Sequence, residues 1–401
     1  MFPEGSWCWR NALSQTLPRG AKPDRAPPTQ GRKLGANWPS AVFTSACSTG
    51  EGSGTARCLH FCVRRLHCVK LPARVAAAAV LADSDRRCYQ RPMPADFVSL
   101  PDICAITYVR GAAAQGDSLP DLLIEVPHGA TRASDFHALR SRLRGPFPEN
   151  LIDFFFVNTD VGAPETALLL AAELTKVDHR RTVVVIRSLI PRTFIDCNRV
   201  VDVTSQPAVS EVGGMTPGVV RYVTDAKDLE LLFLRYSAYR AAVTLAFEQV
   251  CDAGGTALML HSYAPRSIDV PVDENIVAAL HAAYQPEVEP TWPLRAEVDF
   301  ITRTPEGAVL ADEDLIATMR SVFAAAGLAT TESGEYPLHQ STLAWTFASR
   351  WPRQTLLVEL RRDLLVRAFT PFAEMQADDD KCARMAALLA SALHRWRQRT
   401  G

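Results

Sequence analysis

The chain has 401 residues, of which 47% are hydrophobic, and its formal net charge at pH 7 is -1. This length suits two or three average domains or one large one, and the hydrophobic content is ordinary for a protein that buries a core. A net charge so close to zero gives no overall basic field, so we expect no nucleic-acid and no membrane partner. The longest apolar stretches, such as residues 75–82, are too short to cross a bilayer, and we expect a soluble protein.

The first 118 residues mix Pro, Gly, Ser and Arg with short apolar runs, and no helical or strand period persists among them. We therefore expect residues 1–118 to be a largely disordered or irregular extension. Residues 1–100 hold 14 Lys or Arg against six Asp or Glu, an excess that resembles a transit peptide, although no amphipathic Arg-rich helix opens the chain. We expect a cytoplasmic protein, or a mitochondrial one if this segment is a transit peptide; a translated upstream region without a folded role is the alternative.

Cysteine usage does not indicate a disulfide scaffold. Seven of the ten cysteines precede residue 119, and Cys197, Cys251 and Cys382 are scattered through the rest, which suits a reducing compartment. The stretch CLHFCVRRLHC at residues 58–68 combines cysteines with histidines, but its spacing does not match the paired C-x2-C pattern of structural zinc sites.

From Asp121 onward, apolar runs of strand length alternate with segments of helical spacing. The predicted strands are residues 121–126, 182–188, 256–262 and 355–361. The predicted helices are residues 164–176, 225–255, 273–284, 312–327 and 378–396. This alternation indicates an α/β layered fold with a mainly parallel or mixed sheet.

Three polar residues stand at or near the ends of predicted strands. His128 follows DLLIEVP, His261 lies near the end of TALMLHS, and Glu359 lies within TLLVELR. In open α/β sheets ligands bind outside the carboxyl ends of the strands. Each residue taken singly is more often a satisfied structural group, but two histidines and a carboxylate together match what a zinc hydrolase requires.

The order of the chain's motifs resembles that of the N-formylglutamate amidohydrolase family, a branch of the zinc-carboxypeptidase-like hydrolases. The resemblance spans almost all of residues 121–375 and does not cover the first 118 residues. It implies a catalytic domain at residues 119–401 with a three-layer, zinc-carboxypeptidase-like α/β fold and a mixed central sheet. The motifs are VPHGAT (126–131), NTDVGAPETALLLAAEL (158–174), RTFIDCNR (192–199), LMLHSYAPRS (258–267), ITRTPEG (301–307) and VELRRDLL (358–365).

The resemblance implies that Zn²⁺ is bound by His128 as the first ligand and His261 as the last. The acidic ligand between them is harder to place, because related enzymes use a Glu three positions after the first His, where this chain has Thr131. We favour Asp160 in NTDVGA as that ligand; its alternative role is to cap the helix expected from Pro164. Glu125 and Asp135 are the reserve candidates for this acidic ligand.

The resemblance also implies the catalytic and substrate-binding residues. Glu359 matches the general base that takes a proton from the zinc-activated water. Asn198 and Arg199 resemble the pair that holds a substrate carboxylate, for which the planar guanidinium is suited. Arg192 is expected to stabilise the oxyanion or bind a second carboxylate.

Two further residues receive supporting roles. Arg303 in ITR is a candidate for substrate anchoring, and Asp196 is expected to orient an arginine or a ligand histidine. For each arginine the alternative role is an ordinary surface ion pair, which contributes little.

Other mechanisms find less support. Cys197 with His261 could form a thiol hydrolase, but no cysteine-hydrolase signature surrounds it, and Ser262 lacks the G-x-S-x-G elbow. The glycine pairs at 213–214 and 254–255 match neither the P-loop nor the dinucleotide fingerprint.

The sequence therefore predicts a zinc-dependent amidohydrolase that acts on N-formylglutamate or another N-acyl amino acid, a small-molecule partner. One alternative is a zinc peptidase or amidase acting on a peptide or cell-wall amide, because the expected pocket loops at 200–222 and 328–350 carry no readable specificity. A non-catalytic binding protein on the same fold is a third possibility, against which the presence of His128, His261 and Glu359 argues. The sequence does not indicate the oligomeric state.

Overall fold

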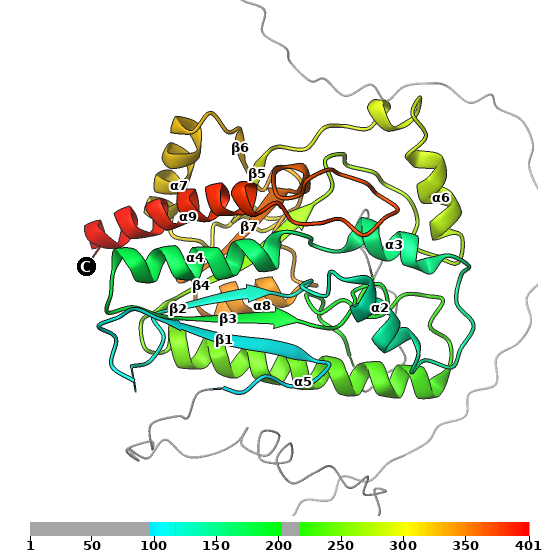
Figure 1. Ribbon diagram of the computed structural model, residues 1–401, viewed down its shortest axis with the longest axis horizontal. Coiled ribbons are helices and arrows are strands. Elements are labelled where there is room, and N and C mark those ends of the chain that lie inside the picture. Colours follow the sequence, from blue (N-terminus) through cyan, green and yellow to red (C-terminus); the bar gives the residue numbers. More distant parts are fainter. Residues whose placement is uncertain (1–96, 117, 203–216, 401) are drawn as a thin grey trace, which may run out of the picture. The chain divides into compact units, whose positions relative to one another are not determined.

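A seven-stranded sheet lies at the centre of the part of the chain that the computed structural model describes, which is residues 97–116, 118–202 and 217–400. Its strand order is β1-β3-β2-β4-β7-β5-β6 (Figure 1). The strands are β1 (Cys104–Arg110), β2 (Leu122–Val126), β3 (Thr182–Ser188), β4 (Thr256–Tyr263), β5 (Val298–Ile301), β6 (Thr330–Glu332) and β7 (Thr355–Arg361).

Strands β3, β2, β4 and β7 are parallel to one another and form the middle of the sheet. Their sequences are almost continuously apolar, as in LLIEV and TVVVIRS, because both faces of such strands are covered. β1 runs antiparallel to β3, and β5 runs antiparallel to β7. The prediction of a mixed central sheet is therefore confirmed.

Helices cover both faces of the sheet, which gives three layers. Alternate strand residues divide between two apolar clusters: Leu123, Met259 and Leu357 belong to one, and Leu122 and Leu258 to the other. The first cluster includes buried residues of the long helix α5 (Ala226–Cys251), and the second includes those of α4 (Ala163–Val177) and α9 (Asp379–Thr400). In Figure 1, α4 and α9 lie on one side of the sheet and α5 on the other. The predicted layered α/β class is confirmed.

Several of these helices begin at residues that favour a helix start. Pro164 lies in the first turn of α4, Asp225 caps α5 by accepting hydrogen bonds from backbone amides, and Asp312 and Thr342 do the same for α7 and α8. The remaining helices are α2 (Ala133–Arg140), α3 (Leu151–Asn158), α6 (Ile276–Ala283), α7 (Glu313–Ala325) and α8 (Leu343–Arg350), with short 3-10 turns at Glu289–Thr291 and Arg362–Leu364.

The folded unit begins before residue 119, contrary to the expected domain boundary. β1 pairs along its whole length with β3, from Cys104 opposite Ser188 to Arg110 opposite Thr182. This edge strand is only partly buried, so its apolar pattern is weaker than that of the central strands. The rest of the extension that we expected to be irregular, residues 1–96, lies outside the described residues. The CLHFCVRRLHC stretch belongs to that part.

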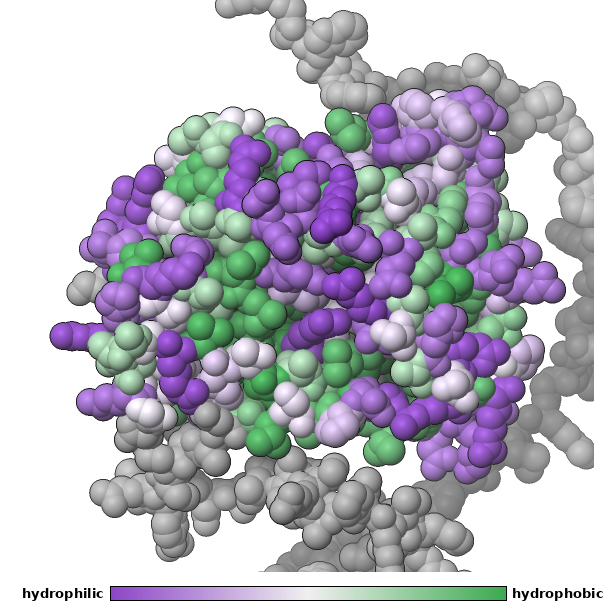
Figure 2. Space-filling view, in the orientation of Figure 1, coloured by the Kyte–Doolittle hydropathy of each residue, from purple (hydrophilic) through white to green (hydrophobic). Residues whose placement is uncertain are grey.

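Within the described ranges, no helix is long and apolar enough to span a membrane. The face of the molecule in Figure 2 mixes polar and apolar side chains. Exposed large apolar side chains are spread over several elements, such as Leu168 on α4, Leu234 on α5 and Leu294 in a loop, as is normal for a protein surface.

Candidate metal centre

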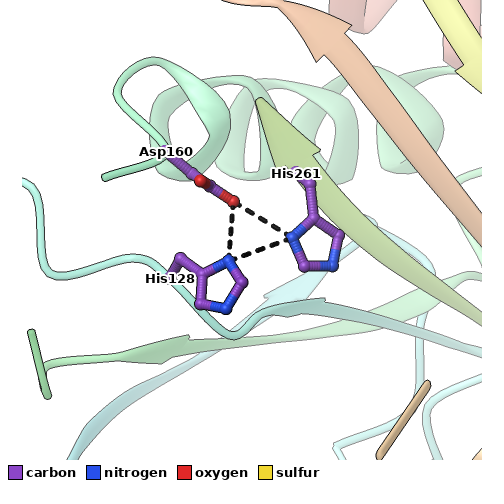
Figure 3. Close-up of side chains that lie close together, drawn as sticks. All are labelled: His128, Asp160 and His261. Carbon is purple, nitrogen blue, oxygen red and sulfur yellow. Dashed lines mark hydrogen bonds and ion pairs between the residues drawn. The ribbon is translucent and has the colours of Figure 1, made fainter. Parts of the chain in front are cut away.

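Three buried side chains from separate segments point toward one another at the carboxyl end of the central strands (Figure 3). His128 lies two residues beyond β2, His261 is in β4, and Asp160 lies in the turn between α3 and α4. The Oδ2 atom of Asp160 is 3.2 Å from Nδ1 of His128 and 3.0 Å from Nδ1 of His261. The two Nδ1 atoms are 3.3 Å apart. The sequence-predicted ligands are thus brought together.

These separations fit a tetrahedral zinc ion. With bond lengths of about 2.0 to 2.1 Å, two ligand atoms of a tetrahedral zinc site lie about 3.3 Å apart, close to the three distances found here. Two imidazole nitrogens and one carboxylate oxygen are also a donor set that zinc prefers, and three protein ligands leave a fourth position for water or substrate. The residues therefore fit a catalytic zinc site.

The local backbone directs Asp160 into this cluster rather than onto helix α4. The N-cap of α4 is Gly162, and no side chain caps it. Gly162 has a φ of 87°, and a Cβ atom there would lie 2.4 Å from Cβ of Leu365, so the turn requires glycine. The alternative role of Asp160 as a helix cap is thus not what the structure shows.

Asp196 links His128 to two arginines. Its Oδ1 atom is 2.8 Å from Nε2 of His128, and its Oδ2 atom accepts a hydrogen bond from Arg192 at 2.8 Å, with Arg199 at 3.8 Å. Burial alone would raise the pKa of Asp196, but Arg192 and His128 hold it well below its usual range. A carboxylate on the far nitrogen of a ligand histidine fixes the ring's orientation and tautomer, which is the role predicted for Asp196.

Charge within the cluster favours an ionised Asp160. Burial opposes its ionisation, yet the two imidazoles lower the pKa of Asp160 below its ordinary value. Burial and Arg192 would lower the pKa of His128, but Asp196 and Asp160 outweigh them and raise it. A cation at the cluster would therefore meet a negative carboxylate and would compete with a proton on His128.

Glu359 lies beside the cluster on β7, directly opposite His261 of β4 in the sheet register. Burial raises the pKa of Glu359 to about 7, with His261 acting in the opposite direction and Asp160 in the same one. Its Oε2 atom is buried and makes no hydrogen bond with any described residue. A carboxylate of this pKa exchanges a proton easily at neutral pH.

A cavity of about 730 Å³ opens onto the cluster. His128, Asp160 and His261 line it together with Glu359. Four more of the expected site residues line the cavity, because Arg192, Asp196, Asn198 and Arg199 follow β3 in one segment. Asn198 also accepts a hydrogen bond from the backbone of Ala344 at 3.0 Å, which ties this segment to α8.

The cavity is also lined by charged and aromatic residues to which the sequence analysis assigned no role. Arg295 donates to the hydroxyl of Tyr336 at 2.6 Å and lies over the rings of Tyr263 and Tyr336. Arg362 is 2% exposed and donates to the backbone oxygens of Val157 and Ser262. Sequence alone gave no signal for these residues, because their burial and stacking depend on segments far apart in the chain.

Arg303 is not part of this site. Its side chain is half exposed and pairs with Glu332 at 2.9 Å, and it does not line the cavity. The chain after β5 turns this side chain toward β6, so the structure does not bring Arg303 to the cavity, and its role as a substrate anchor stays a prediction. Arg303 forms the ordinary surface ion pair that was the alternative.

The two further candidates for the acidic ligand have other partners. Asp135 accepts hydrogen bonds from the backbone amides of Thr131 and Arg132 at the start of α2, both at 3.0 Å. Glu125 is buried in β2 and accepts a hydrogen bond from the hydroxyl of Tyr239. Neither belongs to the group of mutually close ligand atoms.

The structure gives no support to nucleophilic mechanisms. Cys197 is buried, and burial raises the pKa of its thiol, which disfavours a thiolate. Ser262 donates to the backbone oxygen of Val161 at 3.0 Å and is not paired with a histidine base.

Comparisons with known proteins find similarity at the level of structure. No protein-family model matches the chain, and no curated protein matches it. One similar solved structure is an N-formylglutamate amidohydrolase from Ralstonia eutropha, with 16% identity, a TM-score of 0.44, and 74% of this chain and 99% of that chain covered. Another, a gene product of Agrobacterium tumefaciens, has 18% identity, a TM-score of 0.41, and coverage of 74% and 95%.

A metallo-carboxypeptidase from Burkholderia cenocepacia is a third, with 12% identity, a TM-score of 0.34, and coverage of 74% of this chain and 61% of that chain. Identities this low do not transfer a function, which has to be argued from this chain's own residues.

Proposed function

We propose that this chain hydrolyses the C–N amide bond of a small N-acyl amino acid, of which N-formylglutamate is the first candidate, with zinc bound by His128, Asp160 and His261. The observation that carries this proposal is the convergence of the three ligand atoms, 3.0 to 3.3 Å apart, beside a buried carboxylate on a cavity wall. The proposal that the cleaved amide is not a peptide bond rests on the resemblance of the motifs to the N-formylglutamate amidohydrolase family.

Zinc in such a site supplies Lewis acidity, which brings the pKa of a water toward about 7 and polarises a carbonyl group. Glu359 then has the position and the pKa for a general base. Its carboxylate takes the proton of the water that attacks the amide carbon and delivers that proton to the leaving nitrogen. Burial raises the pKa of Glu359 toward the neutral range, where a carboxylate can both accept and return a proton.

The arginines on the cavity wall are suited to an anionic substrate. Arg199 and Asn198 would hold the carboxylate of the amino acid, since a guanidinium pairs with a carboxylate through two parallel hydrogen bonds. Arg192 is held in place by Asp196 at 2.8 Å and would contribute positive charge where the carbonyl oxygen becomes negative.

The size and lining of the cavity also admit substrates with acyl groups larger than formyl. Its volume of about 730 Å³ lies in the range that holds drug-sized ligands, whereas an N-formyl amino acid is much smaller. Part of the lining is apolar and comes from the segment after β4, namely Ile268, Val270 and Val272. The same observations support a second candidate, a short peptide or cell-wall amide.

The test combines metal analysis with a substrate panel. The full chain is purified, its zinc content is measured, and hydrolysis is followed on N-formyl, N-acetyl and longer N-acyl amino acids, with dipeptides alongside. We expect one zinc per chain and turnover of N-acyl amino acids that Glu359→Gln lowers by about two powers of ten or more. Turnover of dipeptides alone would favour the second candidate, and zinc-loaded protein inactive on all members would contradict both.

A further inference from the structure

The two ligand histidines differ in what surrounds their far nitrogen atoms. Nε2 of His128 is 2.8 Å from the carboxylate of Asp196. Nε2 of His261 is buried and makes no hydrogen bond with any residue that the structure describes. A histidine that binds a metal almost always donates its other N–H to a carboxylate, a carbonyl or a water. If His261 binds a metal through Nδ1, its Nε2–H therefore needs a hydrogen-bond acceptor.

A buried carboxylate with an unused oxygen lies on the neighbouring strand. Glu125 is 1% exposed in β2, and the hydroxyl of Tyr239 on α5 donates to its Oε1 atom. Its Oε2 atom is buried and, within the described part of the chain, has no hydrogen-bond partner. A carboxylate is rarely buried without further partners, so this one needs an explanation.

The sheet places Glu125 and His261 on the same face. Glu125 pairs with Met259 of β4, and His261 follows Met259 by two residues, so that all three side chains point to the α5 side of the sheet. Glu125 and His261 therefore face the same layer from adjacent strands.

Glu359 is the other carboxylate beside His261, but it faces a different space. Glu359 lines the cavity, as a residue that contacts water and substrate must, whereas Glu125 does not. His261 lies between the two, on the strand that separates β2 from β7. Glu125 is therefore placed to support His261 from the side away from the cavity, and Glu359 is placed to act on the cavity side.

We propose that Glu125 is a positioning residue for the metal centre, whose Oε2 atom accepts the Nε2 proton of His261 through one bridging water and so directs Nδ1 toward the metal. Tyr239 holds the other oxygen of the same carboxylate and fixes its orientation. Glu125 thus serves His261 as Asp196 serves His128. This inference rests on the proposed zinc site.

The experiment measures zinc affinity in a competition with a chromophoric chelator, together with thermal unfolding of the metal-free chain. The informative variant is Glu125→Leu combined with Tyr239→Phe, because it removes the acceptor and leaves no buried hydroxyl without a partner. Glu125→Gln keeps an acceptor oxygen but loses the charge. Tyr239→Phe alone is the matched control, and Glu359→Gln tests the other neighbouring carboxylate.

We expect the double variant to bind zinc about 10- to 100-fold more weakly than the unaltered chain, which is the usual effect of losing such a partner. The zinc affinity of Glu125→Gln should lie between those of the double variant and the unaltered chain. Tyr239→Phe and Glu359→Gln should each change the zinc affinity by less than about threefold. The metal-free double variant should still unfold cooperatively. A purely structural role would change unfolding and leave zinc affinity the same.

Three results would overturn the inference. Equal zinc affinity in the folded double variant and the unaltered chain would show that Glu125 does not support His261, while leaving the proposed function intact. A larger loss in Glu359→Gln than in the double variant would assign the role to Glu359. Absence of zinc binding by the unaltered chain would overturn the metal site and the inference together.

Discussion

His261 and Glu359 occupy the same register on the adjacent parallel strands β4 and β7. Paired residues of neighbouring strands direct their side chains to the same face, so the sheet itself sets a proposed metal ligand next to the proposed base. Both side chains line the cavity. The relative position of ligand and base is therefore fixed by backbone hydrogen bonds rather than by a loop, which gives the precision that catalysis requires.

The first prediction concerns the metal ligands. His128→Ala and His261→Ala should each lower bound zinc well below one equivalent, because a site with three protein ligands loses much of its affinity with one imidazole. Zinc is measured by elemental analysis after dialysis, with thermal unfolding of the metal-free variants as the control for folding. Stoichiometric zinc in a folded double variant would rule out these ligands.

Asp160→Asn tests the acidic ligand. The substitution keeps the size of the side chain but removes its negative charge, so zinc should bind much more weakly than to the unaltered chain. Asp135→Asn is the matched control, because Asp135 accepts backbone hydrogen bonds at the start of α2 and lies outside the cluster. If Asp160→Asn and Asp135→Asn bound zinc equally well, Asp160 would not be a ligand.

Glu359→Gln should separate catalysis from binding. Glutamine cannot accept the proton, so turnover should fall by about two powers of ten or more, while zinc stays bound. In the unaltered enzyme kcat/KM should rise with pH, because Glu359 must be ionised to act. The midpoint of that rise should lie at or below about 7, since a bound cation lowers a neighbouring carboxyl's pKa.

The residual activity of Glu359→Gln should lack this rise. The measurement is a pH series of kcat/KM for both proteins, with zinc content determined at each pH to exclude loss of metal in acid. Near-normal turnover by Glu359→Gln would mean that another group activates the water.

Arg199→Lys tests recognition of the substrate carboxylate. Lysine keeps the charge but loses the planar fork, so KM for a carboxylate substrate should rise by about tenfold, with smaller changes in kcat and zinc content. Arg303→Lys is the control, because Arg303 is half exposed and pairs with Glu332 away from the cavity. Equal KM values for the two variants would remove Arg199 from the substrate site.

Truncation tests where the folded unit begins. A chain that starts at Phe97 retains β1 and should unfold cooperatively, as the irregular pattern of the preceding residues predicts. A chain that starts at Leu119 loses β1 and exposes the edge of β3, so we expect a marked loss of stability or aggregation. Thermal unfolding and gel filtration of the two chains provide the comparison. Equal stability would show that β1 contributes nothing.

The alternation of strands and helices from β2 onward was readable from the sequence, because buried parallel strands are continuous apolar runs and the long helices have clear caps. The prediction for residues 182–188 matches β3, and that for 355–361 matches β7. The short helices α2, α3 and α8 and the strands β1, β5 and β6 were not predicted. β5 and β6 have only four and three residues, and β1 is a partly buried edge strand, so none of them shows the continuous apolar run that marks β3 and β7. The three helices are about two turns long, too short for a clear helical period.

For the site, the sequence by itself determined the types of group available: His128, His261 and Glu359 at strand ends, where the fold collects polar residues. It left Asp160 divided between a ligand and a helix cap, and it kept Arg303 as a further candidate for substrate anchoring. Only the tertiary structure decided these cases, because the turn at Gly162 directs Asp160 to the histidines and the chain after β5 directs Arg303 to Glu332. A residue's chemistry is local to the sequence, whereas its distance to a residue a hundred positions away depends on how the sheet is assembled.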